Sequence, residues 1–118
     1  MNKIHLAFTF AILTAGLAQG AAPCKQGYVW REAFRDDYAC VTPESRAQAA
    51  HDNGQAGARI DQNHAYGPDT CVQGYVWREA NPRDHVCVTP AIRSRSAEEN
   101  RLAARRTAPP EPRGQRID

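Results

Sequence analysis

Two acidic residues recur at the same spacing in two stretches of the chain. Glu32 and Asp37 in the first stretch are matched by Glu79 and Asp84 in the second. Paired carboxylates can serve as the general acid and base of a hydrolase. A catalytic pair needs a cleft, however, and a repeated unit this short has little depth to form one. We therefore interpret the carboxylates as ion-pair partners of repeated arginines: Arg31 and Arg78, or Arg46 and Arg93.

The other residues that could do chemistry do not repeat as a set. No histidine accompanies the serines of both stretches, so a nucleophilic triad is not supported. His51, His64 and His85 have no counterparts in the other stretch, which favours surface positions for all three. The cysteines are too widely spaced for a C-x-x-C redox or zinc pair. We predict that the protein is not an enzyme and holds no metal or cofactor.

An aromatic pair also occurs twice, and it is the candidate binding site. Tyr28 and Trp30 are matched by Tyr75 and Trp77, with a valine between the two rings each time. In a strand this alternation places both rings on one side. Exposed rings could stack on sugars or accept a partner's apolar side chain. Few other large apolar groups are present, however, so we expect these aromatics to form the core rather than a binding face.

Four cysteines bracket the two stretches. They are Cys24 and Cys40 in the first and Cys71 and Cys87 in the second. In an exported chain, four cysteines most often form two disulfides. The repeat favours the Cys24–Cys40 and Cys71–Cys87 pairing over the two other combinations. Each bond closes a loop of about 17 residues and contributes about 3 kcal/mol in the chain-entropy model, which helps a chain too small to bury a large core.

The repeated unit extends beyond the cysteines. Residues 24–59 and 71–106 align without a gap, and nineteen of the 36 positions are identical. Such repetition predicts two tandem modules, at residues 21–59 and 71–106, joined by a polar linker over residues 60–70. We expect the fold to be α+β, with each module a small disulfide-stapled β-hairpin followed by a helix.

Local sequence supports each of these elements. Residues 28–31 have the aromatic and β-branched content of a strand, and residues 38–41 follow a turn as the returning strand. Thr42 then precedes a proline and a glutamate, which is typical of a helix start. Helices are therefore predicted over residues 43–59 and 90–106, and the second is better supported because glycines interrupt the first.

Two geometric expectations follow. If Ala33 paired with Tyr38 across the turn, Cys40 would lie too far from Cys24 to bond, so the repeated glycine at Gly27 should mark a bend that folds the cysteine back over the hairpin. A stripe of the helix should face that hairpin, with Arg46 or Arg93 near a repeated acid. The stripe is formed by Arg46, Ala50, Asn53 and Gly57.

The ends of the chain differ from the modules. Residues 1–20 combine a positive start, a short apolar run and a small-residue cleavage signal, which predicts a cleaved secretory signal peptide rather than a membrane span. Residues 107–118 are rich in proline and charge and are predicted to be a disordered tail. The formal net charge is +2 with mixed signs, which does not favour nucleic-acid binding.

The motif C-x-x-G-Y-V-W-R-E-A, followed by Asp in the turn and then C-V-T-P, covers residues 24–59 and 71–106. It resembles a short module of secreted bacterial proteins that occurs alone, in tandem or appended to other domains. The resemblance implies export and modularity, and it transfers no site residues.

These observations predict an exported, non-enzymatic binding protein, secreted or periplasmic. Its expected partner is an extracellular protein or a cell-envelope glycan, and no membrane span is expected after the signal is cleaved. The alternative is a small secreted hydrolase inhibitor, which would present an exposed loop held rigid by the cystine, at residues 34–38 or 81–85.

Overall fold

The computed structural model describes residues 21–110 of the chain. The expected signal peptide and residues 111–118 of the expected tail lie outside this range. The elements form two similar series: β1 (Val29–Trp30), β2 (Cys40–Val41), α2 (Pro43–Gln55) and the 3-10 helix η1 (Gly57–Arg59), then β3 (Val76–Trp77), β4 (Cys87–Val88), α3 (Pro90–Leu102) and the 3-10 helix η2 (Ala103–Arg106). The two strand pairs are antiparallel, so the expected organisation of two hairpin–helix modules is confirmed.

The hairpin register differs from the expected one. Trp30 pairs with Cys40, whereas the expected pairing of Ala33 with Tyr38 would have placed Trp30 opposite Val41. The difference arises in the turn, where Glu32 has a left-handed backbone (φ 54°). Ala33 then donates its N–H to the carboxylate of Asp37 (2.9 Å) rather than to a strand carbonyl. The Asp37 side chain thus adds to the backbone bonds that close the turn, from the Glu32 N–H to the Asp37 carbonyl (3.2 Å) and from the Asp37 N–H to the Phe34 carbonyl (3.1 Å). The pattern alone did not predict this side-chain bond.

Both disulfides are present. They join Cys24 to Cys40 and Cys71 to Cys87, with Cα atoms 5.6 and 5.7 Å apart. The bend that this pairing requires lies at Gly27, which has φ 95° and sits in a turn closed by the Tyr28 N–H donating to the Lys25 carbonyl (3.1 Å). Such a φ is open to glycine and strained for other residues, which explains why both copies carry glycine there.

Each helix begins at the predicted residues. Thr42 and Thr89 are the N-caps, and a proline occupies the first helical position in both. The α-helices end at Gln55 and Leu102, and each continues as a 3-10 turn. Two members of the predicted stripe contact the hairpin: Asn53 donates to the Ala33 carbonyl (2.9 Å), and an ion pair of 2.7 Å joins Arg46 to Glu32. All four stripe residues are exposed, however, and the buried face of α2 carries Ser45, Ala49 and Asp52 instead.

The cap of α3 gives a direct test of the helix start. Thr89 is exposed, and its hydroxyl accepts the Ile92 N–H (3.3 Å). Replacing Thr89 with alanine should lower the free energy of unfolding by about 1 kcal/mol, because that N–H loses its partner. Chemical denaturation measures the change. Thr89→Ser keeps the oxygen and should leave stability nearly unchanged, so equal losses in both variants would contradict the cap.

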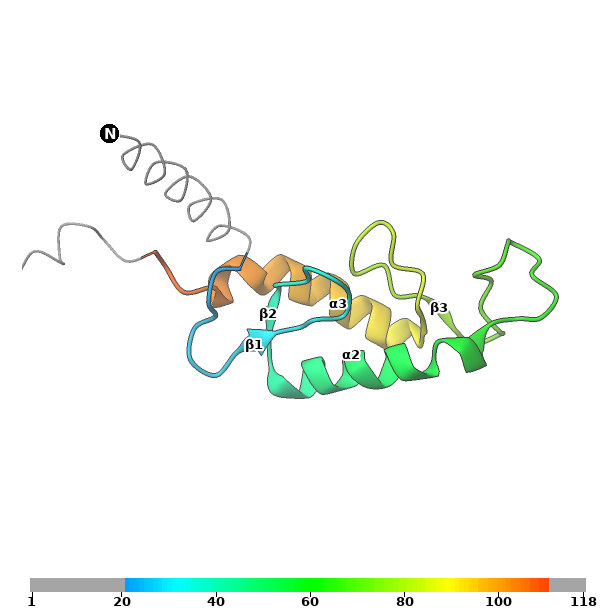
Figure 1. The fold of residues 1–118 in the computed structure, drawn as a ribbon, viewed down its shortest axis with the longest axis horizontal. Coiled ribbons are helices and arrows are strands. Elements are labelled where there is room, and N and C mark those ends of the chain that lie inside the picture. Colours follow the sequence, from blue (N-terminus) through cyan, green and yellow to red (C-terminus); the bar gives the residue numbers. More distant parts are fainter. Residues whose placement is uncertain (1–20, 111–118) are drawn as a thin grey trace, which may run out of the picture.

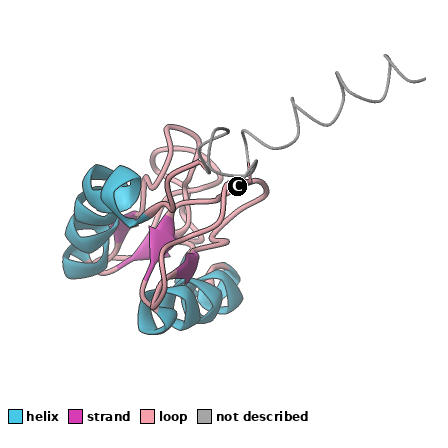
Figure 2. Ribbon diagram, turned by 90° about the vertical axis from the view of Figure 1, so that its left-hand side faces the viewer, coloured by secondary structure: helices cyan, strands magenta, loops and turns pink. Residues whose placement is uncertain are grey.

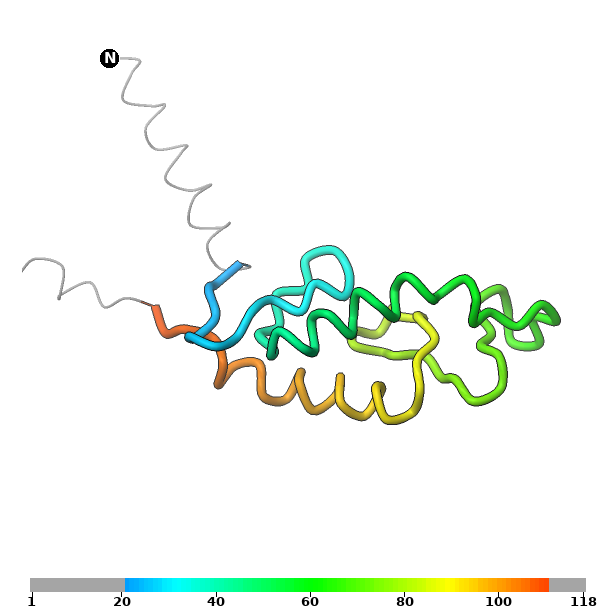
Figure 3. Tube along the Cα trace, turned by 90° about the horizontal axis from the view of Figure 1, so that it is seen from below, coloured from blue at the N-terminus to red at the C-terminus, as the bar shows by residue number. Residues whose placement is uncertain are grey.

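The two modules interlock. The helices α2 and α3 run in opposite directions, as Figures 1 and 3 show, and each ends beside the hairpin of the other module. Lys25 donates its N–H to the Arg106 carbonyl (2.8 Å), and Val72 donates to the Arg59 carbonyl (2.8 Å). The expectation of a disordered tail from residue 107 onward is wrong at its start, because the Ala108 N–H donates to the Pro23 carbonyl (2.9 Å).

The core is small and lies between the helices, around the short strands (Figure 2). Its apolar members are alanines, valines and the inner cysteines: Ala33, Cys40, Val41, Ala49, Ala80, Cys87 and Val88. Arginines and aspartates are buried beside them, at Arg31, Asp37, Arg78 and Asp84. The four repeated aromatics are only half-buried, so the expectation that they form the core is not met. Of the helices within residues 21–110, none has the length and apolarity to cross a membrane.

Candidate functional site

An open groove of about 820 Å³ lies on module 2, between the segment that joins the modules and strand β3. Three aromatic side chains line it, Tyr66, Tyr75 and Trp77, together with polar groups of Asp61, Gln73 and Arg93. The sequence placed two of these aromatics in a candidate binding site. The groove adds a third ring and the polar groups around it.

The segment over residues 61–70 is a hydrogen-bonded loop rather than a plain linker. Its two ends are joined where the Asp61 N–H donates to the Thr70 carbonyl (2.8 Å). Inside the loop, the buried Thr70 hydroxyl accepts the Tyr66 N–H (2.8 Å) and donates to the Gly67 carbonyl (2.7 Å). This network fixes the backbone under Tyr66, whose side chain is 85% exposed. The loop therefore holds the backbone of Tyr66 in place and presents its ring to solvent.

Tyr75 and Trp77 are braced by neighbouring side chains. The guanidinium of Arg59 lies 4.7 Å from the centre of the Tyr75 ring, a cation–π contact. The imidazole of His85 stacks on Trp77 with ring centres 3.7 Å apart. The Trp77 indole N–H donates to the Asp69 carbonyl (2.8 Å). Both rings line the groove in orientations that these contacts hold fixed.

Two charged side chains line the groove, Asp61 and Arg93, and Arg93 is held in an ion pair. Arg93 forms an ion pair of 2.6 Å with Glu79, and both side chains are about half exposed. His85 lies 3.0 Å from the Asp69 carboxylate through its Nδ1 atom. The groove therefore offers apolar ring surface, hydrogen-bonding edges and the Asp61 carboxylate, which accepts the Asn63 N–H (2.9 Å).

The corresponding aromatics of module 1 are held differently. The indole N–H of Trp30 donates to the Ala22 carbonyl (3.0 Å), and its ring meets Tyr38 edge to face at 4.8 Å. The hydroxyl of Tyr38 donates to the Asp36 carboxylate, and this bond together with the carboxylate charge raises the pKa of the phenol above its ordinary value. Tyr38 is therefore a neutral hydrogen-bond donor at neutral pH and no candidate base.

The repeated carboxylates are engaged in ion pairs, as the sequence predicted. Asp37 lies 2.7 Å from Arg31 and Asp84 lies 2.6 Å from Arg78, and all four side chains are buried. The glutamates Glu32 and Glu79 pair with Arg46 and Arg93 on the surface. No carboxylate of these two sets is placed as a free acid or base beside the groove.

Tyr66 was missed by sequence reasoning. One indication of its role is present in the sequence: Tyr66 is a large aromatic residue in the segment between the modules, which is not part of the repeat. Within residues 21–110, no group of three or more His, Cys, Asp or Glu side chains is arranged to hold a metal ion.

Comparison of the chain with protein-family models, with curated proteins and with solved structures found no match.

Proposed function

We propose that this is an exported, non-enzymatic protein that binds a cell-envelope glycan in the groove of module 2. The observation that carries the proposal is the convergence of Tyr66, Tyr75 and Trp77 on one open groove of about 820 Å³. A groove of this size accommodates a short oligosaccharide segment, since small-molecule sites usually measure roughly 300–1,000 Å³.

The chemistry of the groove suits a sugar. One face of a pyranose ring presents C–H groups, which pack well on the electron-rich face of an aromatic ring. Its hydroxyl groups need donors and acceptors at the edges, and Asp61, Gln73 and Arg93 supply these. The aromatic rings provide contact area with little loss of side-chain entropy, because they have few rotatable bonds.

Export places the ligand outside the cytoplasm. Both disulfides form within residues 21–110, which is typical of an oxidising compartment. The signal-peptide pattern over residues 1–20 supports secretion or a periplasmic location. Envelope polysaccharides are the abundant glycans that an exported bacterial protein would meet.

The inhibitor alternative receives less support. A protein that blocks a hydrolase cleft usually offers an extended backbone that pairs like an added strand. The turn at residues 81–85 is instead closed on itself, because the Asp84 N–H donates to the Asn81 carbonyl (3.1 Å). Assays of purified hydrolases with stoichiometric amounts of the protein would reveal inhibition if the turn acted in this way.

Tyr66 provides the sharpest test of the glycan proposal. Peptidoglycan sacculi and chitin, both insoluble polymers of amino sugars, should retain the mature protein in a sedimentation assay. Tyr66→Ala should weaken retention about tenfold, because an exposed aromatic anchor is lost. Its 85% exposure means that folding should not change.

Gln62→Ala is the matched control, since Gln62 is exposed on the same loop and does not line the groove. Its retention should equal that of the unmodified protein. If neither polymer retains the protein, or if the Tyr66 and Gln62 variants bind equally well, the glycan proposal is wrong.

A further inference from the structure

Two kinds of contact between the modules, the strand bridges and the arginine–tyrosine contacts, come in equivalent pairs. The bridge between Cys24 and Thr107 is repeated between Cys71 and Ile60. The hydrogen bonds that accompany these bridges are both 2.8 Å long. The start of each module therefore contacts the end of the other module's helix in the same way.

Aromatic contacts across the modules follow the same rule. Arg59 of module 1 covers the Tyr75 ring at 4.7 Å, and Arg106 of module 2 covers the Tyr28 ring at 4.9 Å. The residues that make these contacts are identical in the two copies. Exchanging one module for the other would therefore preserve both contacts.

Buried arginines link the modules at the centre. Arg31 donates to the Asn100 amide oxygen (2.9 Å) and lies 3.6 Å from Glu99, both on the helix of the other module. In the opposite direction, Arg78 donates to the Ala33 carbonyl (3.4 Å). A cavity of about 10 Å³ lies among them, lined by equivalent positions of both modules. The acceptors of the two arginines differ, but the bridges, the aromatic contacts and the cavity lining follow an approximate two-fold axis, as in a self-complementary interface.

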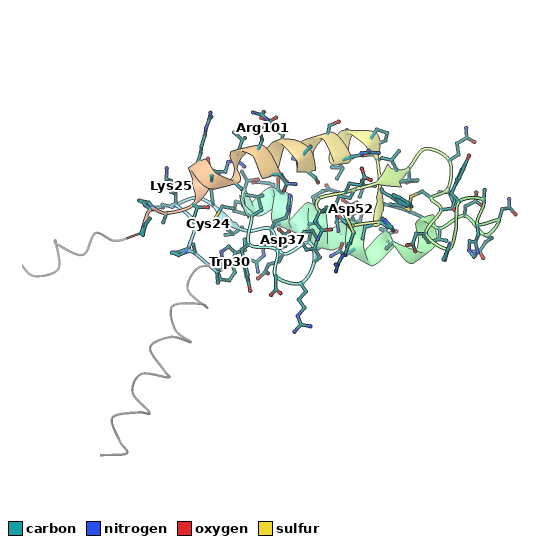
Figure 4. All side chains as sticks on the ribbon, turned by 90° about the horizontal axis from the view of Figure 1, so that it is seen from above. Cys24, Lys25, Trp30, Asp37, Asp52 and Arg101 are labelled. Carbon is teal, nitrogen blue, oxygen red and sulfur yellow. A yellow bond between two sulfur atoms is a disulfide. The ribbon has the colours of Figure 1, made fainter. Side chains whose placement is uncertain are left out.

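Only the loop over residues 61–70 joins the modules covalently, because each disulfide lies within one module. At the opposite end of the molecule, the segments around Cys24 and Thr107 make the same contacts with no short covalent connection between them. Figure 4 places Cys24 and Lys25 beside the end of α3. The contacts at that end therefore form without a short linker.

We propose that the surface between the modules is a self-association surface whose partner is a second copy of this module, whether on the same chain or on another chain. The tandem chain is in effect a dimer of modules joined by one loop. A chain that presents a single copy of the module is accordingly the kind of partner that this surface fits.

Cleavage of the loop in the folded protein tests this. A site-specific protease sequence inserted between His64 and Ala65, which are both exposed, allows cleavage after folding. The two halves should stay together at native pH and separate in denaturant without reductant. After refolding the mixture, native mass spectrometry should detect pairs of identical halves beside the mixed pair.

Dissociation of the halves on cleavage, or recovery of the mixed pair alone, would overturn the proposal. Arg59→Ala should weaken the cleaved complex about tenfold or more, because Arg59 also donates to the Cys87 carbonyl across the interface (2.9 Å). Arg46→Ala is the matched control, since Arg46 pairs only within its own module. Equal dissociation of both variants would also count against the interface.

Discussion

Replacing Asp84 with alanine is expected to lower the free energy of unfolding by about 3–5 kcal/mol, the usual cost of removing one partner of a buried ion pair. Asp84 binds the Arg78 guanidinium at 2.6 and 3.1 Å and also accepts the Ala80 N–H (3.1 Å). Without it, Arg78 would keep the Ala33 carbonyl as its hydrogen-bond acceptor among residues 21–110. A buried positive charge would then lack compensation.

Urea denaturation of Asp84→Ala and Arg93→Ala measures this difference within one module. Arg93 pairs with Glu79 on the surface, where both side chains are about half exposed, and such pairs contribute at most about 1 kcal/mol. Since small domains have only about 5–15 kcal/mol of stability, Asp84→Ala should unfold at a much lower urea concentration or be unfolded at once. Similar midpoints for the two variants would mean that the buried pair does not hold the module together.

Buried ion pairs such as Arg78 with Asp84 explain why the prediction of an aromatic core was wrong. A count of large apolar residues leaves only the aromatics to fill the interior, and it therefore predicts that Trp30 and Trp77 lie in the core. The interior is instead filled by Arg31 and Arg78 with their aspartates, beside Val41 and its counterpart. The sequence did predict the partners of these carboxylates, but a residue count cannot show that paired charges replace apolar volume.

Local features were predictable because they depend on neighbouring residues. The N-cap at Thr42, the glycine bend at Gly27 and the pairing of Cys24 with Cys40 each rest on a short motif or on the repeat itself. The register was not predictable in this way. It depends on the left-handed backbone of Glu32, which is uncommon for a residue other than glycine.

The groove of module 2 and the packing of the two modules against each other could not be predicted from the sequence, because both depend on the three-dimensional fold. The position of Tyr66 depends on the hydrogen bond from its N–H to the Thr70 hydroxyl, within a loop that the sequence indicated only as polar. The helix face toward the other module carries Ser45, Ala49 and Asp52. Small and polar residues on a helix are typical of a solvated face, so nothing in the pattern indicated that this face is covered.

Removing one disulfide should destabilise both modules. Replacing Cys24 and Cys40 with serine is expected to lower the free energy of unfolding by about 2–5 kcal/mol, the usual cost of losing a native bond in a small secreted domain. A Trp30→Phe background leaves Trp77 as the reporter of module 2. Its fluorescence midpoint in urea should fall together with the far-ultraviolet circular dichroism of the whole chain.

Both modules should lose stability together because the Cys24–Cys40 disulfide holds residues that contact module 2. Cys24 pairs with Thr107 just after α3. Removing the Cys24–Cys40 bond therefore frees the end of α3 as well as the hairpin of β1 and β2. Arg31 and Asn100 would then lose the geometry that joins the module centres. A chain with an interface of this kind should unfold in one transition. If the Trp77 midpoint stays unchanged while module 1 unfolds, the modules are independent and the interface contributes little to stability. The reciprocal variant, with Cys71 and Cys87 replaced and Trp30 as reporter, should give the same coupled loss, because the bridge of Cys71 to Ile60 is equivalent to the bridge of Cys24 to Thr107.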